Sequence, residues 1–462
     1  MSIKMEGQTE PAKQRCIEPG CAATFGLDDR VYVCSRCGGL LDIELVGVKD
    51  AGLLKRRWRE RLSSFDVRDR SGVWRFRELL PFLEHAPIVS LDEGNTPLYE
   101  APKSASYCGL NHLRLKHQGA NPTGSFKDTG MTTAVTQSRL LGAKLVVCAS
   151  TGNTAASLAA YAARASIPCA IMVPEGQVSH AKLAQALDYG ALVLELEGNF
   201  DISMRLVREL ALDESIYLVN SINPFRIEGQ KTVAAELCEQ LGWESPDHLV
   251  VPGGNLGNSS AFGKGFRELL DLGLIDRMPQ ITIVQAEGAA PFAHLFARHQ
   301  GDLEKGHTPS ELENVNDPKT LASAIKIGAP VSWKKAWRSL RWTSGRVLTV
   351  TEEEIADAKA IVGRDGIGCE PASATTVAGI RKLLIEGAVG KDENVVAVLT
   401  GHLLKDTDYV IDYHSGNLTS ESKTGPRNIT GKFTNRPVQV KAEIDRIRDL
   451  FAGLVASREE VS

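Results

Sequence analysis

One lysine in the sequence, Lys127, lies in a stretch whose composition could make its amine chemically reactive. The stretch reads NPTGSFKDTG, where Pro122 and Gly124 favour a turn and the following MTTAVTQSRLLG favours a helix. A free lysine has a pKa of about 10.4 and is protonated at neutral pH. It becomes a nucleophile only when burial or nearby positive charge lowers that pKa. An exposed loop lysine is the competing interpretation, so Lys127 needs support from other stretches.

A second stretch, ASTGNTAAS, has the composition of a ligand-binding helix start. It follows a strand-like run and precedes a helical one, so Asn153 and Thr154 offer polar groups at the helix N-terminus. Anions and polar ligands commonly bind there. A plain N-cap is the alternative, because Asn and Thr are favoured caps.

The stretch VPGGNLGNSSAFGKGF is the strongest candidate for an anion site. Glycines allow backbone N–H groups to face a phosphate, and the dipole of the following helix favours negative charge. The spacing matches neither a Walker A loop nor the G-x-G-x-x-G fingerprint, so we expect a phosphate site that does not bind a nucleotide. A tight turn that needs glycine only for its geometry is the alternative. The candidate residues are Gly254, Asn255, Leu256, Gly257 and Asn258.

Two more polar runs could belong to the same site. NSINPFRIEGQKT holds Asn220, Ser221 and Arg226 before an expected helix. The arginine fork suits a second phosphate or a carboxylate. The apolar run NVVAVLT ends in Thr400, and a hydroxyl at the carboxyl end of a strand commonly faces a ligand crevice. A surface loop is the alternative for the arginine run.

Four cysteines near the start of the chain are spaced like metal ligands. Four residues separate Cys16 from Cys21, twelve separate Cys21 from Cys34, and two separate Cys34 from Cys37. Two such knuckles can place four thiolates around a tetrahedral zinc ion. A small hairpin without metal is the alternative.

Alternating strand-like and helical segments must position these residues. Short apolar runs such as KLVVCAS alternate with helical runs such as TAASLAAYAARA. The pattern predicts an α/β fold with doubly wound parallel sheets that carry helices on both faces. We expect an amphipathic helix near the C-terminus to dock on the body. The predicted parts are an N-terminal region at 1–90 with the cysteine hairpin at 14–45, a large domain at 91–144 and 246–412, a small mobile domain at 145–245, and a C-terminal extension at 413–462.

The composition excludes several classes of protein. The chain has 462 residues, 43% hydrophobic and 24% charged, with a net charge of −4. These values are typical of a globular protein of several domains and do not indicate a nucleic-acid or anionic-membrane partner. The N-terminus has no apolar signal-peptide core, and no run approaches about 18 apolar residues. We therefore expect a soluble cytoplasmic protein, in which cysteines are thiols or metal ligands.

Together the motifs resemble those of the fold-type II pyridoxal-phosphate enzymes. NPTGSFKDTGM is similar to their lysine motif, STGNTAAS to their ring-binding loop and PGGNLGN to their phosphate loop. NSINPFRIEGQKT, CEPASA and TGHLLKD are more similar to the threonine synthase family than to dehydratases or cysteine synthases. The resemblance covers about residues 14–410, and the flanking sequences look like the plant-type branch. The plant-type flanks imply a homodimer and activation by S-adenosylmethionine.

The resemblance implies a role for each candidate residue. Lys127 would form an aldimine with pyridoxal 5'-phosphate, Asn153 would contact the ring hydroxyl, and Thr400 would face the ring nitrogen. The strand end carries no Asp or Glu, so we expect that nitrogen to stay uncharged. Gly254 to Asn258 would hold the cofactor phosphate. The substrate phosphate would contact Thr154, Asn220, Ser221 and Arg226. The implied reaction converts O-phospho-L-homoserine and water to L-threonine and phosphate.

Departures from the family motif leave other activities open. His117 and Gln118 stand where a glutamate is usual, Thr129 where an arginine is usual, and Leu403 where a glycine is usual. A cysteate-synthase-like enzyme acting on phosphoserine is one alternative. A serine/threonine dehydratase is another, although Arg226 argues against it because that substrate carries no phosphate. A non-catalytic zinc-ribbon binding protein is the remote alternative, and the intact lysine and anion loops argue against it.

Overall fold

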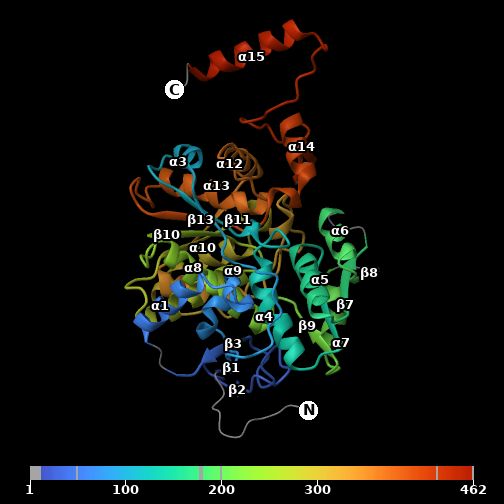
Figure 1. Cartoon of the computed structure of the whole chain (residues 1–462), viewed down its shortest axis with the longest axis vertical. Coiled ribbons are helices and arrows are strands. Elements are labelled where there is room, and N and C mark those ends of the chain that lie inside the picture. Colours follow the sequence, from blue (N-terminus) through green and yellow to red (C-terminus); the bar gives the residue numbers. More distant parts are fainter. Residues whose placement is uncertain (1–11, 48–49, 176–179, 198–199, 423–424, 460–462) are drawn as a thin grey trace.

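Two parallel sheets organise the chain, which is described by a computed structural model over residues 12–47, 50–175, 180–197, 200–422 and 425–459 (Figure 1). Residues 1–11, the start of the predicted N-terminal region, lie outside the described residues. Among the helices described, none is long and apolar enough to cross a membrane.

The larger sheet has six strands in the order β12-β11-β10-β13-β5-β4. Its strands are β4 (Leu98–Glu100), β5 (Arg114–His117), β10 (His248–Pro252), β11 (Gln280–Ala286), β12 (Arg346–Val350) and β13 (Val395–Leu399). Every neighbouring pair is parallel except β4 with β5. The central strands are buried on both faces, which explains why they read as continuous apolar runs.

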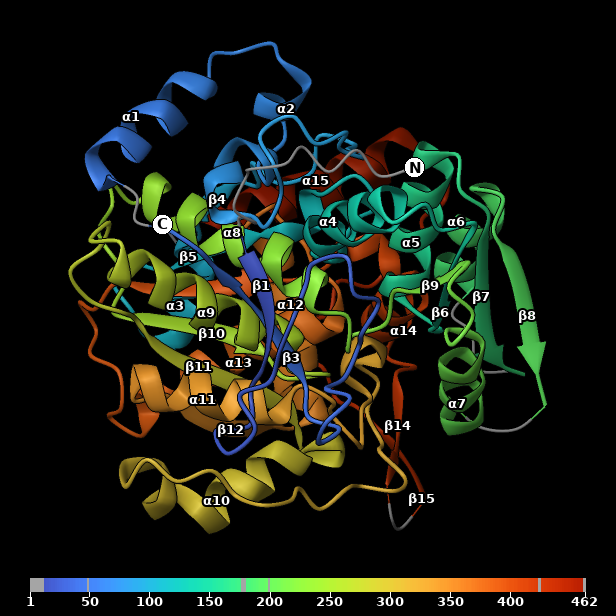
Figure 2. The ribbon, with the colours of Figure 1, turned by 90° about the horizontal axis from the view of Figure 1, so that it is seen from below.

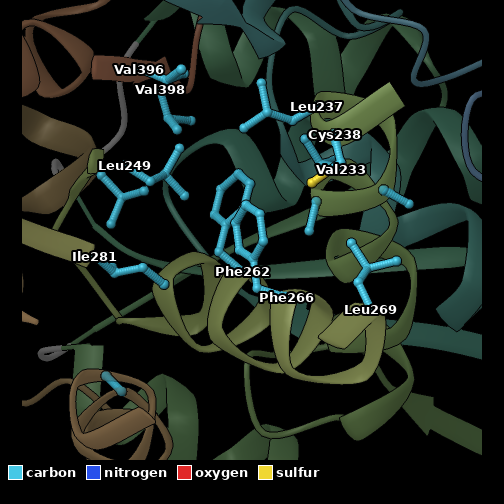
Figure 3. Close-up of a cluster of buried hydrophobic side chains, with 14 of the residues drawn as sticks. Val233, Leu237, Cys238, Leu249, Phe262, Phe266, Leu269, Ile281, Val396 and Val398 are labelled. Carbon is cyan, nitrogen blue, oxygen red and sulfur yellow. The ribbon is translucent and has the colours of Figure 1, made fainter. Parts of the chain in front are cut away.

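Alternate residues of these strands feed two separate cores. Leu249 packs with Phe262 and Phe266 on one face, as Figure 3 shows, whereas its neighbour Val250 packs into the core on the other face. The first core is covered by α8 (Pro224–Gln240), α9 (Gly257–Asp271), α10 (Pro291–Glu304) and α11 (Trp333–Thr343). The second is covered by α3 (Pro102–Cys108), α12 (Glu352–Arg364) and α13 (Pro371–Ile385).

The smaller sheet has four parallel strands in the order β8-β7-β6-β9. They are β6 (Leu145–Ala149), β7 (Cys169–Pro174), β8 (Leu192–Leu196) and β9 (Ile216–Leu218). The helices of this part are α4 (Lys127–Leu140), α5 (Asn153–Ala165), α6 (His180–Asp188) and α7 (Phe200–Leu210). Val146 packs with α4 and α5, and Val147 packs with α7 on the opposite face. The predicted α/β class with doubly wound parallel sheets is confirmed.

A small antiparallel sheet ordered β2-β1-β3 forms the N-terminal hairpin from β1 (Ala12–Cys16), β2 (Thr24–Phe25) and β3 (Leu41–Leu45). Cys16 ends β1, and the other three N-terminal cysteines lie in the connections between the strands. Figure 2 shows this hairpin lying across the helices of the larger part. Lys335 Nζ of α11 donates to the Leu41 carbonyl oxygen at 2.6 Å. Tyr32 Oη accepts from the Leu218 N–H of the smaller sheet at 2.8 Å. The hairpin therefore contacts both parallel-sheet parts.

The remaining elements connect or extend these parts. They are α1 (Ala51–Arg61), α2 (Val67–Arg70), η1 (Trp74–Leu79), η2 (Gln118–Ala120), η3 (Glu287–Ala289), η4 (Ser323–Ile325), η5 (Leu403–Lys405), α14 (Thr407–Ser415), β14 (Thr419–Ser422), β15 (Gly425–Asn428) and α15 (Ile444–Glu459).

The prediction that the C-terminal helix docks on the body is wrong. Figure 1 shows α15 standing away from the rest of the chain, with Ile444, Leu450 and Phe451 exposed. An amphipathic pattern indicates that a helix has an apolar face, but it does not say which surface covers that face.

Candidate active site

Lys127 is the first residue of α4, and a short loop fixes its position against the end of β13. Gly124 has φ 81°, a left-handed conformation that favours glycine, and so allows the turn before the lysine. The Phe126 N–H donates to the Thr400 carbonyl oxygen at 2.9 Å, and Ser125 forms an isolated bridge with Gly401. These contacts bring two of the predicted site residues, Lys127 and Thr400, to the same edge of the larger sheet.

The neighbouring Asp128 fastens the same loop to α5. Its buried carboxylate accepts from the Thr123 N–H at 2.7 Å, from Thr123 Oγ1 at 2.6 Å and from Ser157 Oγ at 2.5 Å. Burial raises the pKa of Asp128 to about 6, although these hydrogen bonds oppose the shift. Three donors on one carboxylate hold the start of α4 rigidly, which is what a positioned amine requires.

The surroundings of Lys127 make its amine unusually easy to deprotonate. Its side chain is partly exposed, and Nζ lies 4.2 Å from the centre of the Phe126 ring. Loss of solvation and, to a lesser extent, the charge of Arg226 lower the pKa of Lys127, and Glu370 opposes them, so that the pKa lies at about 7. Near neutral pH the amine is therefore available as a nucleophile.

We expect reductive alkylation of Lys127 in the cofactor-free protein to rise with pH through a midpoint near 7. The neutral amine reacts with an aldehyde and the ammonium does not, so the midpoint reports the lowered pKa of Lys127. Peptide mass spectrometry after trapping at each pH gives the profile. Exposed Lys144 is the internal control for the labelling reaction. A Lys127 midpoint near the ordinary lysine value of about 10.4 would contradict the assignment.

The glycine-rich loop between β10 and α9 has the geometry of an anion site. Leu256 has φ 63° at the start of α9, and the adjacent Asn258 has both side-chain amide atoms buried without a hydrogen-bond partner in the described chain. A Cβ at Gly254 would lie 3.2 Å from the Ala324 carbonyl oxygen, so this position has little room for a side chain. The Asn255 side chain has a structural contact, since its Oδ1 accepts a hydrogen bond from the Val331 N–H at 2.9 Å.

The residues expected to contact the substrate phosphate differ in their burial and in their hydrogen bonds. Arg226 is 2% exposed, its Nη1 donates to the Val219 carbonyl oxygen at 3.3 Å, and burial lowers its pKa to about 10. Its Nε has no partner among the residues described. Thr154 lies in the first turn of α5, and Ser221 Oγ accepts from Asn255 Nδ2 at 3.2 Å.

The side-chain amide of Asn220 forms two hydrogen bonds with the backbone of Ala149. Its Oδ1 accepts from the Ala149 N–H at 3.0 Å, and its Nδ2 donates to the Ala149 carbonyl oxygen at 2.8 Å. The side chain therefore ties the loop after β9 to the end of β6, and in this geometry it positions the loop.

Sequence reasoning missed Glu370, a buried carboxylate beside the predicted ring contacts. Its Oε1 accepts from Thr400 Oγ1 at 3.1 Å, and its Oε2 accepts from Asn153 Nδ2 at 3.0 Å. The absence of Asp and Glu from the strand end thus did not mean that no carboxylate lies there, because Glu370 arrives from the start of α13. The expectation that the ring nitrogen facing Thr400 stays uncharged was based on the absence of a nearby carboxylate, and Glu370 removes that basis. The signal was present in CEPASA, the stretch that contains Glu370.

The polar groups around Lys127 fit a phosphorylated ring with a reactive carbonyl. Buried polar atoms are nearly always paired, yet several here have no partner in the described part of the protein. They are Ser125 Oγ, Asn153 Oδ1, Arg226 Nε, Gln230 Oε1 and both amide atoms of Asn258. Together with an amine of lowered pKa and a glycine-rich helix start, this donor and acceptor set suits pyridoxal phosphate.

Comparison with known proteins supports this reading of the geometry. Residues 89–401 match the family model of the pyridoxal-phosphate dependent enzymes. The chain is 46% identical over 400 residues to threonine synthase of Methanocaldococcus jannaschii, covering 86% of this chain and 94% of that protein. It is 44% identical over 440 residues to threonine synthase of Methanosarcina acetivorans, covering 95% and 98%. It is 37% identical over 457 residues to the chloroplastic threonine synthase 2 of Arabidopsis thaliana, covering 96% and 84%.

Solved structures share the fold at lower sequence identity. The processed form of threonine deaminase isoform 2 from Solanum lycopersicum has a TM-score of 0.57 at 21% identity, covering 78% of this chain and 89% of that chain. A fungal L-serine ammonia-lyase from Rhizomucor miehei has a TM-score of 0.59 at 19% identity, covering 72% and 100%. Likeness at this level shows the fold alone.

Proposed function

The chain belongs to the pyridoxal-phosphate-dependent enzymes and, within them, to the threonine synthases, and we propose how its residues convert O-phospho-L-homoserine and water to L-threonine and phosphate. The observation that carries the assignment of residues is the amine of Lys127. Its pKa is lowered to about 7, and the loops around it contribute buried polar atoms that have no partner among the residues the structure describes.

Pyridoxal phosphate, when bound, supplies an electron sink for the carbon atoms next to the substrate amino group. Lys127 would hold it covalently, the loop from Gly254 to Asn258 would bind its phosphate, and Asn153 and Thr400 would contact its ring. With a pKa near neutrality, Lys127 Nζ can also take a proton from a substrate carbon and return it.

The substrate phosphate would be bound by Arg226 with Thr154 and Ser221, while Asn220 holds the loop after β9 that carries Ser221. A buried guanidinium whose Nε–H has no partner in the described part of the chain is a strong donor to a phosphate oxygen. Arg226 also favours a phosphorylated substrate over the free hydroxy amino acid of a dehydratase.

The substrate assignment is tested by measuring phosphate release from O-phospho-L-homoserine and from O-phospho-L-serine. The two substrates differ by one methylene, and we expect kcat/KM to favour phosphohomoserine by about 10-fold or more. Chromatography of the products should show L-threonine. Equal or better turnover of phosphoserine would support the cysteate-synthase-like alternative instead.

We further propose that Cys16, Cys21, Cys34 and Cys37 bind a structural zinc ion. Their Sγ atoms all lie within 4.8 Å of one another, with Cys16 to Cys37 at 3.5 Å and Cys21 to Cys34 at 3.6 Å. Zn–S bonds of about 2.3 Å in a tetrahedron place sulfur atoms about 3.8 Å apart, so these separations suit the ion. The Gly39 N–H donates to Cys37 Sγ at 3.4 Å, as in a metal-binding knuckle.

We expect one zinc ion per chain in protein purified without chelator, measured by plasma mass spectrometry. Cys34→Ser should lose the metal and lower Tm by about 5 °C or more, because metal binding is coupled to the folding of so small a hairpin. Cys108→Ser is the matched control, since Cys108 is a buried thiol that donates to the Val377 carbonyl oxygen. Wild-type protein that contains no zinc and takes none up would contradict the proposal.

The assembly, location and domain division are also proposals. We propose a homodimer in the cytoplasm, and the exposed apolar residues Ile444, Leu450 and Phe451 of α15 support a second copy as the covering surface. Light scattering checks the homodimer, and cell fractionation checks the cytoplasmic location.

The four-stranded sheet supports a small domain at 145–245, whose movement on substrate binding would appear in hydrogen exchange.

A further inference from the structure

Glu370 occupies the point where three parts of the site meet. It is 1% exposed and precedes α13, and its N–H donates to the Gly401 carbonyl oxygen at 3.0 Å. Its carboxylate lies so close to Gly401 that a Cβ at that position would collide with it. Through its two oxygens it contacts Thr400 at the end of β13 and Asn153 at the start of α5.

The hydrogen bonds around Glu370 have only one consistent direction. Ser373 Oγ accepts from the Thr400 N–H at 2.8 Å and the Gly401 N–H at 3.1 Å, so its own proton can go to Thr400 Oγ1 at 3.0 Å. The Thr400 proton then goes to Glu370, because a carboxylate only accepts. Asn153 Nδ2 donates a hydrogen bond to Glu370, and Asn153 Oδ1 has no partner in the described chain.

Glu370 also opposes the effect of Arg226 on the Lys127 amine. The charged groups that act on Lys127 are Arg226, which disfavours the ammonium, and Glu370, which favours it. The other adjacent carboxylate, Asp128, is occupied by Thr123 and Ser157.

We propose that Glu370 is a positioning residue of this site, whose carboxylate holds the Asn153 amide and the Thr400 hydroxyl in one orientation and offsets the positive charge of Lys127. The inference rests on the proposed function, because Asn153 and Thr400 are the proposed ring contacts. Glu370 would then have two separable effects. Its negative charge favours the Lys127 ammonium, and the length of its side chain lets it hold Asn153 and Thr400 together.

The test compares Glu370→Gln, which keeps the shape and removes the charge, with Glu370→Asp, which keeps the charge and shortens the reach. Lys127 in cofactor-free protein is trapped with an aldehyde and borohydride across pH. In Glu370→Gln the midpoint should fall by about one pH unit, because the opposing charge is gone. In Glu370→Asp it should stay within about 0.3 unit of wild type, while kcat falls about 10-fold because a shorter side chain cannot hold both partners.

Glu352→Gln is the matched control, since Glu352 is a half-buried carboxylate on α12 that accepts a hydrogen bond from the Leu321 N–H at 3.3 Å. It should leave both the Lys127 midpoint and kcat unchanged. An unshifted midpoint in folded Glu370→Gln overturns the proposal. If that variant does not fold, wild-type kcat in Glu370→Asp overturns it. Failure of the proposed function looks different, since wild-type protein would then not bind the cofactor or would not be labelled at Lys127.

Discussion

Replacing Lys127 by alanine is expected to abolish the visible absorption of bound cofactor and to lower kcat for O-phospho-L-homoserine by about 10⁴-fold or more. The substitution removes the covalent attachment point and the group that moves protons in one step. Titration of the purified variant with pyridoxal phosphate, followed by a phosphate-release assay, measures both effects. Lys127→Arg should be as inactive as alanine, because its guanidinium keeps the charge but stays protonated.

The fold should survive this change. The loop around Lys127 is held by the Phe126 N–H to Thr400 and by the three donors to Asp128, and none of these bonds uses the lysine side chain. We therefore expect the Tm of cofactor-free Lys127→Ala to lie within about 3 °C of cofactor-free wild type. Lys144→Ala, at an exposed lysine, should behave as wild type throughout. A Lys127→Ala enzyme with wild-type absorption and turnover would remove Lys127 from the site.

The class of fold and the lysine loop could be predicted from the sequence because both are local in origin. Buried parallel strands such as Cys169–Pro174 appear as uninterrupted apolar runs, and turns need glycine where φ is positive, as at Gly124. Helix starts that follow a strand appear as polar and glycine-rich stretches, as before α9. Each of these signals lies within about ten residues.

Features that depend on contacts across the chain could not be predicted in this way. Glu370 is 30 residues from Thr400 and 217 from Asn153 along the chain, so only the meeting of α13, β13 and α5 places its carboxylate there. Asn220 has the composition of a ligand contact, but its amide pairs with the backbone of Ala149, 71 residues away. The position of α15 depends on a surface that an amphipathic pattern cannot identify.

Replacing Arg226 by alanine is expected to lower kcat/KM for O-phospho-L-homoserine by about 10- to 150-fold, with KM raised and kcat reduced. A hydrogen bond to a charged group contributes about 1.5–3 kcal/mol, and the buried guanidinium has an Nε–H without a partner among the residues described, which a substrate phosphate could accept. Arg226→Lys should recover only part of the loss, since a single ammonium lacks the fork. Arg267→Ala, which removes an arginine paired with Asp271 on the surface of α9, is the control.

The same variant tests the effect of Arg226 on Lys127, and its KM separates a phosphate contact from a purely structural arginine. Arg226 lowers the pKa of Lys127, so its removal should raise the Lys127 trapping midpoint above 7, the opposite of the shift expected for Glu370→Gln. An arginine that only supported the fold would lower Tm and leave KM for the phosphorylated substrate unchanged, and that result would exclude it from the phosphate site. Opposite shifts from the two charges, with KM for the phosphorylated substrate affected only by Arg226, would assign phosphate binding to Arg226 and not to Glu370.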